Sequence, residues 1–466
     1  MNSSQQPILF VSLPESGLLN PMLVLAEELS RRGVDNLWFA TEEHRRDDVE
    51  ALKVHTPVGF CSLGEVVPEM SSLSWDDETY QRVTQRSRFK ARKAVIERTF
   101  APRLRMPKYR ALEEAVDRIK PALMVVESMC QFGFELAITK NIPYVLGVPF
   151  VPSNVLTSPV PIGKSYTPPG FPVPHTGLPA TMSFSQRMAN RLFQLRMMAM
   201  FLSAGMRQRN AEDTAVREEL GISPTANTFL ARVDSAELVL CYSIPELDYP
   251  FTMPEVVRTV GAVLPPLPQA PDTELSDWLD ARESVVYMGF GTITRLTREE
   301  VGTLVEVARR MRGSHHFLWK LPKEQQHWLP PVDTLPDNLR VEDWVPSQLD
   351  VLAHPNVKVF FNHAGGNAFH EASYFGKPMV MRPLWVDCYD QAVRGQDLGI
   401  SLTLDRPHTL DPDDVVDKLT RVLTDGSFRE RSEHLGQLQQ AAGGRDAAAD
   451  LLLQVLAKAT HETSER

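Results

Sequence analysis

The fold is decided by residues 344–391, which read WVPSQLDVLAHPNVKVFFNHAGGNAFHEASYFGKPMVMRPLWVDCYDQ. Residues 357–362 form an apolar run that predicts a buried strand, and residues 379–383 predict the next one. Between them, a turn at residues 363–367 leads into a helix that ends near Gly376. Strand, turn, helix and strand in this order predict one unit of a doubly wound parallel sheet.

The turn before this helix carries the residues that predict a ligand. A glycine-containing turn at a helix N-terminus offers free backbone amides and the positive end of the helix dipole, which favour a diphosphate. His363 and Asn367 add side-chain donors at the same end, and the Glu371 carboxylate, one turn into the helix, can accept from ribose hydroxyls. Trp344 offers a flat face for a base. Together these residues predict a nucleoside-diphosphate site.

The same alternation of strands and helices extends outward along the chain. In the N-terminal half, the expected strands are 8–13, 37–40, 122–126 and 144–148. Residues 14–17 are expected to form a turn, with Pro21 in the first turn of the following helix. In the C-terminal half, the expected strands are 284–288, 316–320 and 339–342, with helices at 275–281 and 298–311.

Prolines divide the chain. Pro265, Pro266, Pro268 and Pro271 indicate a linker, so we expect an α/β fold of two Rossmann-like doubly wound domains facing each other across a cleft. The expected divisions are residues 1–250, a linker at 251–275, residues 276–434 and a helical segment at 435–466.

Two segments of the N-terminal half depart from the alternation. Residues 149–180 contain nine prolines and predict a long loop, which is either functional or a stiff surface excursion. Residues 183–219 predict one long helical stretch rich in Met and Leu, which either fills the core or forms an adaptable apolar pocket.

Composition excludes several classes of protein. The 466 residues carry a net charge of −10, which disfavours a nucleic-acid binder and gives no reason to expect binding to an anionic membrane. The N-terminus lacks the pattern of a signal peptide, and no apolar run is long enough for a membrane span. The four cysteines are far apart, form no CxxC pair and indicate free thiols, so we expect a cytoplasmic protein without a metal.

The segment resembles the C-terminal signature of the UDP-glycosyltransferase superfamily, the family-one nucleotide-sugar transferases. The matching residues are Trp344, Pro346, Leu352, His354, His363, Gly365, Asn367, Glu371, Gly376, Pro378, Pro383 and Asp387. Residues 285–292 are similar to the family's strand and phosphate turn, and residues 17–21 to its N-terminal G-H-x-N-P motif. The sequence Asp-Cys-Tyr-Asp at residues 387–390 looks most like that of fungal members.

This resemblance implies a GT-B type fold, in which the N-terminal domain binds a small lipophilic acceptor and the C-terminal domain binds the donor. The final helical segment would then pack back on the N-terminal domain. The donor substrate would be a UDP-sugar, with glucose weakly favoured, and transfer would invert the anomeric carbon without a cofactor or metal. The donor-binding residues would be Thr292, Trp344, Val345, Gln348, His363, Gly365, Gly366, Asn367, Ala368, Glu371, Asp387 and Cys388.

The catalytic base is where the chain departs from the family. Leu18 occupies the position of the family's catalytic histidine, and leucine cannot accept a proton. Glu127 stands where the family has the partner aspartate, and Cys388 replaces the glutamine after Asp387, although a literal Asp-Gln pair follows at Asp390-Gln391.

Three readings of the missing base remain open. Glu15 or Glu127 acts as the base, with a pKa raised by an apolar site; or the acceptor is acidic enough to need little help; or the chain is a non-catalytic UDP-sugar-binding protein. A nucleotide-sugar epimerase on the same architecture is a further alternative. The sequence gives no prediction of an oligomer.

Overall fold

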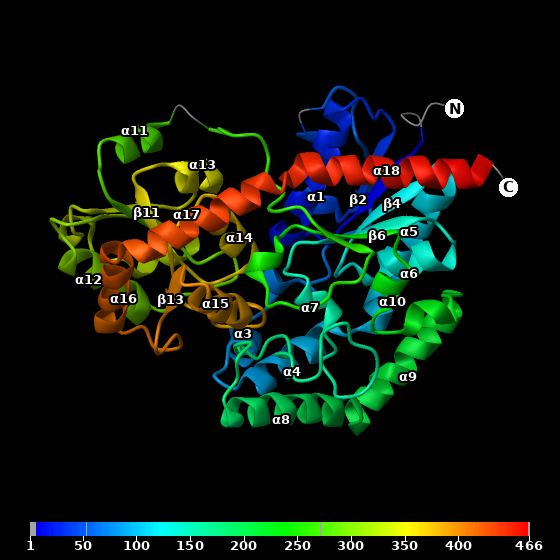
Figure 1. Cartoon of the computed structure of the whole chain (residues 1–466), viewed down its shortest axis with the longest axis horizontal. Helices are drawn as coiled ribbons and strands as arrows, with labels where there is room; N and C mark the ends of the chain where they lie inside the picture. Colours follow the sequence, from blue (N-terminus) through cyan, green and yellow to red (C-terminus); the bar gives the residue numbers. More distant parts are fainter. Residues whose placement is uncertain (1–5, 53, 271–272, 465–466) are drawn as a thin grey trace.

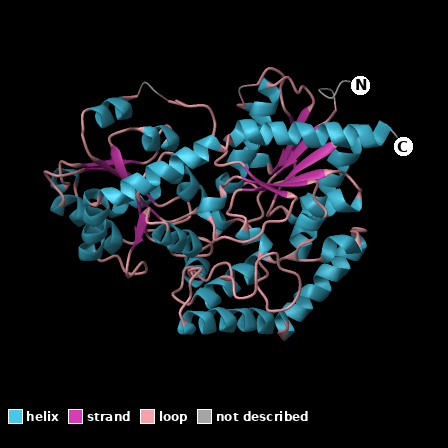
Figure 2. Ribbon diagram, in the orientation of Figure 1, coloured by secondary structure: helices cyan, strands magenta, loops and turns pink. Residues whose placement is uncertain are grey.

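The structure, a computed structural model, describes residues 6–52, 54–270 and 273–464. It comprises two α/β domains that lie side by side, with the N-terminal domain in blue to green and the C-terminal domain in green to orange (Figure 1). In each domain helices surround a sheet, as Figure 2 shows by secondary structure. The expected linker residues Pro271 and Asp272 lie outside the described part.

The N-terminal domain is built on a seven-stranded parallel sheet with the order β3-β2-β1-β4-β5-β6-β7. Its strands are β1 Ile8–Val11, β2 Leu37–Thr41, β3 Gly59–Ser62, β4 Leu123–Glu127, β5 Tyr144–Val148, β6 Leu238–Cys241 and β7 Val257–Thr259. Its helices are α1 Ser16–Arg31, α2 Arg46–Glu50, α3 Asp77–Val83, α4 Arg88–Thr99, α5 Met106–Ile119, α6 Gln131–Thr139, α7 Ser153–Leu156, α8 Phe184–Phe201, α9 Ala204–Glu219 and α10 Ala231–Asp234.

The C-terminal domain is built on a six-stranded parallel sheet with the order β10-β9-β8-β11-β12-β13. Its strands are β8 Val285–Gly289, β9 His316–Lys320, β10 Leu339–Glu342, β11 Val357–Asn362, β12 Met379–Met381 and β13 Ser401–Thr403. The helices from here to the end of the chain are α11 Glu274–Asp280, α12 Arg298–Arg310, α13 Gln348–Ala353, α14 Gly366–Tyr374, α15 Cys388–Asp397, α16 Pro412–Thr424, α17 Gly426–Ala441 and α18 Gly444–Ser464.

The central strands are buried on both faces, as their apolar runs predicted. Every residue of β1, β4 and β8 is buried, and the side chains of alternate residues enter separate core clusters on the two faces of the sheet. The expected fold class of two doubly wound parallel domains is therefore confirmed.

The last helix returns to the first domain. α18 packs against α1, and its residues Ala448, Leu452 and Leu456 lie in the same core cluster as Phe10 and Leu25. In Figure 1 this helix, in red, runs across the top of the N-terminal domain. The two domains are thus tied together at a second point besides the linker.

The strands β3, β6 and β13 were not expected, and three further differences concern the site or the domain boundary. α1 begins at Ser16, so Pro21 lies inside the helix, where it removes only the hydrogen bond to the carbonyl of Gly17. The stretch 183–219 is two helices, because Ser203 caps a new helix by accepting from the Met206 amide at 3.4 Å. β7 joins the first sheet from within the range 251–275, so the chain leaves that sheet only after Thr259.

No helix in the described part of the chain is long and apolar enough to cross a membrane.

Candidate active site

The glycine turn, residues 363–367, opens the site. β11 ends at Asn362, whose side-chain oxygen accepts a 2.7 Å hydrogen bond from the Ala364 amide, and Ala364 adopts a positive φ of 63°. Gly365 then precedes α14 without any side-chain cap. The first amides of α14 therefore keep their hydrogen-bonding capacity, and the positive end of the helix dipole lies at the same point.

His363 stands between two glycines of this site. A Cβ at Gly365 would come within 2.3 Å of its Nε2, and a Cβ at Gly291, which has a φ of 74°, within 2.7 Å of its Cε1. Neither position tolerates a side chain while the imidazole is there. Burial lowers the pKa of His363 to about 4, so the ring is neutral at pH 7, and its Nδ1 has no partner.

A second group of residues surrounds Glu371, which lies one turn into α14 from the glycine turn. Gln348 donates from Nε2 to Glu371 Oε2 at 2.7 Å, and the Tyr287 hydroxyl donates to Gln348 Oε1 at 3.1 Å. Burial raises the pKa of Glu371 to about 7, although Gln348 and the charge of Lys320 oppose that shift. Lys320 Nζ also lies 4.1 Å from the ring centroid of Trp344, which is largely exposed. This arrangement offers a flat ring and a carboxylate to a nucleoside.

The residues after β12 offer two candidates for the carboxylate that would hold sugar hydroxyls, Asp387 and Asp390, and the structure gives them different surroundings. Asp387 lies beside the glycine turn, with Oδ2 3.5 Å from where a Cβ of Gly366 would be, and Gln391 Nε2 donates to it at 3.4 Å. Burial, and then the charge of Asp390, raise the pKa of Asp387 to about 7. The Cys388 thiol lies in the apolar core of the C-terminal domain and is only a weak hydrogen-bond donor. Gln391 is also fully buried, and it is the amide that contacts Asp387.

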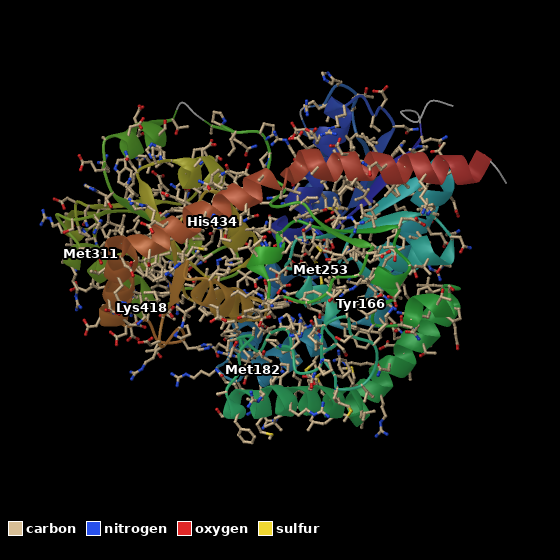
Figure 3. All side chains as sticks on the ribbon, in the orientation of Figure 1. Tyr166, Met182, Met253, Met311, Lys418 and His434 are labelled. Carbon is tan, nitrogen blue, oxygen red and sulfur yellow. The ribbon has the colours of Figure 1, made fainter. Side chains whose placement is uncertain are left out.

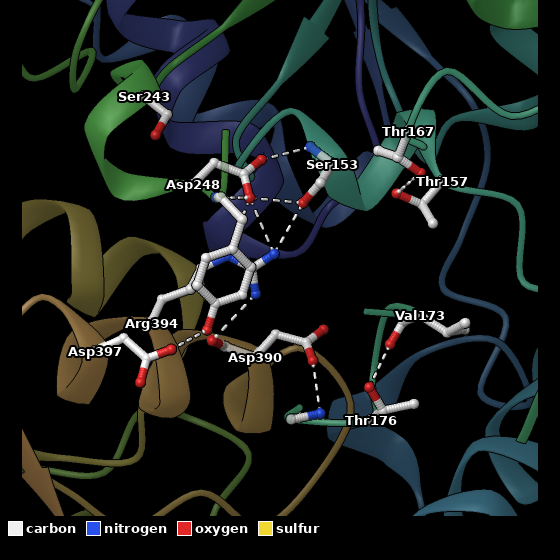
Figure 4. Close-up of polar contacts among 12 residues, drawn as sticks. Ser153, Thr157, Thr167, Val173, Thr176, Ser243, Asp248, Asp390, Arg394 and Asp397 are labelled. Carbon is white, nitrogen blue, oxygen red and sulfur yellow. Dashed lines mark hydrogen bonds and ion pairs between the residues drawn. The ribbon is translucent and has the colours of Figure 1, made fainter. Parts of the chain in front are cut away.

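The Asp390 carboxylate binds the proline-rich loop and does not face the glycine turn. It accepts from the amides of His175 and Gly177 at 2.6 and 2.9 Å, and so holds the end of the proline-rich loop of the N-terminal domain. Figure 4 shows Asp390 on the side of Thr176 of this loop. His175 adopts a positive φ of 74°, and burial lowers its pKa well below the usual value. The loop is therefore fixed against the C-terminal domain beside Asp387.

The remaining predicted donor residues contribute less through their side chains. Val345 and Ala368 are buried in the core of the C-terminal domain, which leaves only their main chain for a ligand. Thr292 is exposed directly after Gly291. Asn367 is half-buried at the start of α14, close to the other domain.

The two domains meet at this point. Gly17, in the first turn of α1, lies so close to Asn367 that a Cβ on it would be 3.9 Å from the amide nitrogen of Asn367. Further contacts surround the pair: His370 Nε2 lies 2.9 Å from Ser243 Oγ, and Arg394 forms an ion pair of 3.0 Å with Asp248 (Figure 4). The N-termini of α1 and α14 therefore face each other.

Two carboxylates of the N-terminal domain lie behind this contact. Glu127, at the end of β4, is fully buried; it accepts from the Met129 amide at 2.7 Å and from Ser128 Oγ at 3.0 Å, while its second oxygen has no partner. Burial, reinforced by the charge of Glu15, raises the pKa of Glu127 to about 8. Glu15 precedes α1, is partly exposed, and also has an oxygen without a partner; burial raises its pKa too.

A half-buried cation completes the site, and nothing in the sequence singled it out. The Arg92 guanidinium, from α4, forms none of the recorded ion pairs, yet its charge acts on both Asp387 and Asp390, and burial lowers its pKa to about 10. Within the described residues, no group of three or more His, Cys, Asp or Glu could hold a metal ion.

A family model described as UDP-glucoronosyl and UDP-glucosyl transferase matches residues 49–442, which includes the whole segment 344–391. The chain belongs to this family. The resemblance inferred from the signature residues is thereby confirmed, although a fungal character is not shown.

Relatives of the UDP-glycosyltransferase family act on different substrates according to their names. UDP-glucuronosyltransferase 2B7 of Homo sapiens is 27% identical over 307 residues, which are 64% of this chain and 54% of that protein. The 2-hydroxyacylsphingosine 1-beta-galactosyltransferase of Rattus norvegicus is 26% identical over 340 residues, covering 72% of this chain and 59% of that protein. The chain therefore spans between 52% and 59% of the length of these relatives and of the UDP-glucosyltransferase 2 of Dactylopius coccus.

Solved structures show the same architecture. The glycotransferase of kitacinnamycin matches with a TM-score of 0.71 at 21% identity, over 97% of this chain and 99% of that one. A UDP-glucose: anthocyanidin 3-O-glucosyltransferase, solved in complex with UDP, matches with a TM-score of 0.64 at 18% identity over the same shares. The expected GT-B type fold is confirmed by this likeness.

Proposed function

We propose that this chain transfers a hexose from a UDP-sugar to a small lipophilic acceptor that bears a hydroxyl or acidic group, with inversion at the anomeric carbon. The observation that carries the proposal is the contact between Gly17 and Asn367, because it brings the acceptor-side carboxylates to the helix N-terminus that suits a diphosphate. Family membership supports a UDP-sugar as the donor. Glucose remains our choice of sugar, and the acceptor is defined only by its class.

The donor half of the proposal assigns one part of the ligand to each feature. Trp344 and Glu371 receive the base and the ribose, and the first amides of α14 with His363 receive the diphosphate. Asp387, positioned by Gln391, receives sugar hydroxyls. Because His363 is neutral at pH 7, it acts as a hydrogen-bond donor and not as a cation. Negative charge that develops on the departing diphosphate is stabilised by this donor and by the helix dipole.

The acceptor half concerns the proton. With a pKa of about 8, Glu127 keeps its proton at neutral pH, so its neighbour Glu15 ionises without a like charge beside it. Glu15 is also the partly exposed member of the pair, whereas Glu127 is fully buried. We therefore assign Glu15 as the general base and Glu127 as its protonated partner.

The reaction then balances in a single displacement. The acceptor hydroxyl gives its proton to Glu15, its oxygen forms a bond to the anomeric carbon, and the bond from that carbon to the diphosphate breaks. UDP leaves with the electron pair of that bond. A positioned base is worth about 10² to 10⁴ in rate for an alcohol, and less for an acceptor that ionises readily.

One experiment tests the proposal. The purified chain is incubated with UDP-glucose, UDP-galactose or UDP-glucuronic acid and a panel of phenols and terpenoid alcohols, and UDP release and acceptor mass are recorded. Acceptor-dependent UDP release with a matching mass increase is expected. UDP binding without release would establish the binding-protein reading, and conversion of UDP-glucose to UDP-galactose without an acceptor would establish the epimerase reading.

A further inference from the structure

α8 carries apolar side chains on two opposite faces. Its inner face packs into the N-terminal domain through Phe193, Met197 and Met200, which contact residues of α4 and the proline-rich loop. Its outer face, which we define as Phe184, Met188, Leu192 and Leu195, follows the spacing of one helical face and points away from that packing. These four side chains are 72%, 55%, 44% and 40% exposed, and Leu202 at the end of the helix is 63% exposed.

The row is unusual for a water-exposed surface. Single exposed apolar residues need no explanation, but a contiguous row of large ones marks a surface that another molecule covers. None of the four side chains belongs to a core cluster of the described structure. In Figure 3, side chains project from α8 away from the body of the molecule, and Met182, which is labelled, marks the start of the helix.

The charge around the outer face is opposite to that of the whole chain. The net charge is −10, yet no Asp or Glu occurs from residue 136 to residue 211. α8 itself carries Arg187, Arg191 and Arg196, all exposed, and none of them pairs with a carboxylate in the described structure. Their recorded partners are a main-chain carbonyl, an amide and an aromatic ring.

We propose that α8 docks this chain onto an anionic lipid surface, with the outer face inserted between headgroups and the arginines on lipid phosphates. A helix with an apolar face flanked by arginines and free of acidic residues lies in the plane of a bilayer interface, and anionic lipids strengthen its binding. The overall negative charge does not oppose this contact, because charges beyond about 8 Å are largely screened at physiological salt.

Docking through α8 would place the acceptor side of the molecule at the lipid, and this consequence rests on the proposed function. The inner face of α8 contacts Val173, two residues before the His175 amide that Asp390 binds beside the sugar subsite. A lipophilic acceptor dissolved in the lipid would reach the N-terminal domain on this side. Docking itself does not depend on catalysis, so its test uses binding alone.

The test compares sedimentation of the full chain with vesicles of phosphatidylcholine alone and with vesicles that also contain phosphatidylserine. We expect binding to the anionic vesicles that falls with added salt. The pair Leu192→Gln with Leu195→Gln should weaken binding by about tenfold per leucine, because less apolar surface is inserted. The pair Arg187→Gln with Arg191→Gln should weaken it by about fivefold per arginine.

The matched control is Val332→Gln, which removes an apolar side chain that is 86% exposed in the C-terminal domain. It should leave vesicle binding unchanged, and all variants should keep the wild-type melting temperature, because the side chains are exposed. Equal sedimentation with and without anionic vesicles would overturn the proposal. So would a dimer in solution that the leucine pair disperses, since the outer face would then bind a second copy.

Discussion

Gln348 donates a 2.7 Å hydrogen bond from its amide to Glu371, and in turn accepts from the Tyr287 hydroxyl. The chain of three polar groups holds one carboxylate oxygen and leaves the other for a ligand. A half-buried carboxylate in this position is the acceptor that ribose hydroxyls need. The pair therefore defines the nucleoside subsite more closely than either residue does alone.

We predict that Glu371→Ala weakens UDP binding by about 1–3 kcal/mol, because the ribose hydroxyls lose a buried acceptor. Calorimetry with UDP measures the change directly. Glu274→Ala is the control, since Glu274 is an exposed carboxylate of the same domain in a surface ion pair with Arg340. Equal UDP affinity of Glu371→Ala and the wild type would remove Glu371 from the donor site.

The pKa of Glu371, about 7, adds a pH dependence to this subsite. If the carboxylate accepts from the ribose, UDP binds the ionised form, so the affinity should rise as the pH increases from about 6 to 8. Calorimetry across this range should show the rise in the wild type, and the rise should be smaller in Glu371→Gln, where Asp387 and the UDP phosphate still titrate. A wild-type affinity that falls over the same range would contradict the assignment.

His363→Ala should lower turnover by a similar factor at every pH from about 6 to 9. Burial holds the imidazole neutral throughout this range, since its pKa is about 4, so the ring acts as a donor to the leaving diphosphate and takes no proton from the acceptor. Steady-state rates over the range give the test. Loss of only one limb of the pH–rate profile would instead make His363 the base.

The residues around Asp387 show what the sequence could and could not predict. The strand, turn and helix at 357–374 follow from apolar runs and glycines, and the structure contains them. To decide whether Asp387 or Asp390 is the partner of Gln391, one needs to know which residues share a face of the helix. Asp387 and Gln391 are four residues apart and share a face of α15, whereas Asp390 lies on another face and holds the loop. That spacing was a signal in the sequence for Gln391.

Other parts of the site depend on contacts between distant segments. Glu15 and Glu127 come together because β1 pairs with β4 in the sheet, so the carboxyl ends of the two strands are neighbours. The family resemblance pointed to Glu127, and closeness to Leu18 in the chain pointed to Glu15, but neither predicted their difference in burial. Arg92 and His175 belong to no motif, and only the packing of α4 and the proline-rich loop against α15 places them near Asp387.

Stability should respond to the pKa of Glu127. The folded-state pKa of about 8 lies above the ordinary value of 4.5, so the folded protein holds a proton that the unfolded chain releases as the pH rises. Stability is therefore greatest below pH 4.5 for this group and is lost as the pH rises toward 8, on the order of 5 kcal/mol in all.

Glu127→Gln removes that titration and keeps an oxygen for the Met129 amide. The variant should gain stability over the wild type at pH 8 and show little difference at pH 5, as measured by chemical denaturation at the two values. Glu246→Gln, an exposed carboxylate of the same domain, should match the wild type at both. A wild-type advantage that grows toward pH 8 would mean that Glu127 is ionised in the folded state.

The assignment of Glu15 predicts a loss of about 10²–10⁴ in rate with an alcohol acceptor when Glu15 is replaced by Gln. The loss should be smaller with a phenolic or carboxylic acceptor, because such an acceptor ionises without help. Comparing the two acceptor classes under saturating donor separates loss of a base from loss of binding. Full turnover of Glu15→Gln on an alcohol would leave the assignment without support.

Leu18 provides the complementary test. It lies in the first turn of α1, three residues after Glu15, and its side chain is half-buried. A histidine there would stand at the position where the family has its base. In the Glu15→Gln background no carboxylate stands at position 15, so the positive end of the α1 dipole would lower the pKa of this histidine. We expect Leu18→His to restore about tenfold or more of the rate that Glu15→Gln loses on a simple alcohol, with a new inflection in the pH–rate profile at or below about 6.5. Leu18→Gln in the same Glu15→Gln background is the control, since glutamine is polar but does not titrate. Rescue by glutamine equal to that by histidine, or no rescue by either, would show that the proton leaves the acceptor at another position.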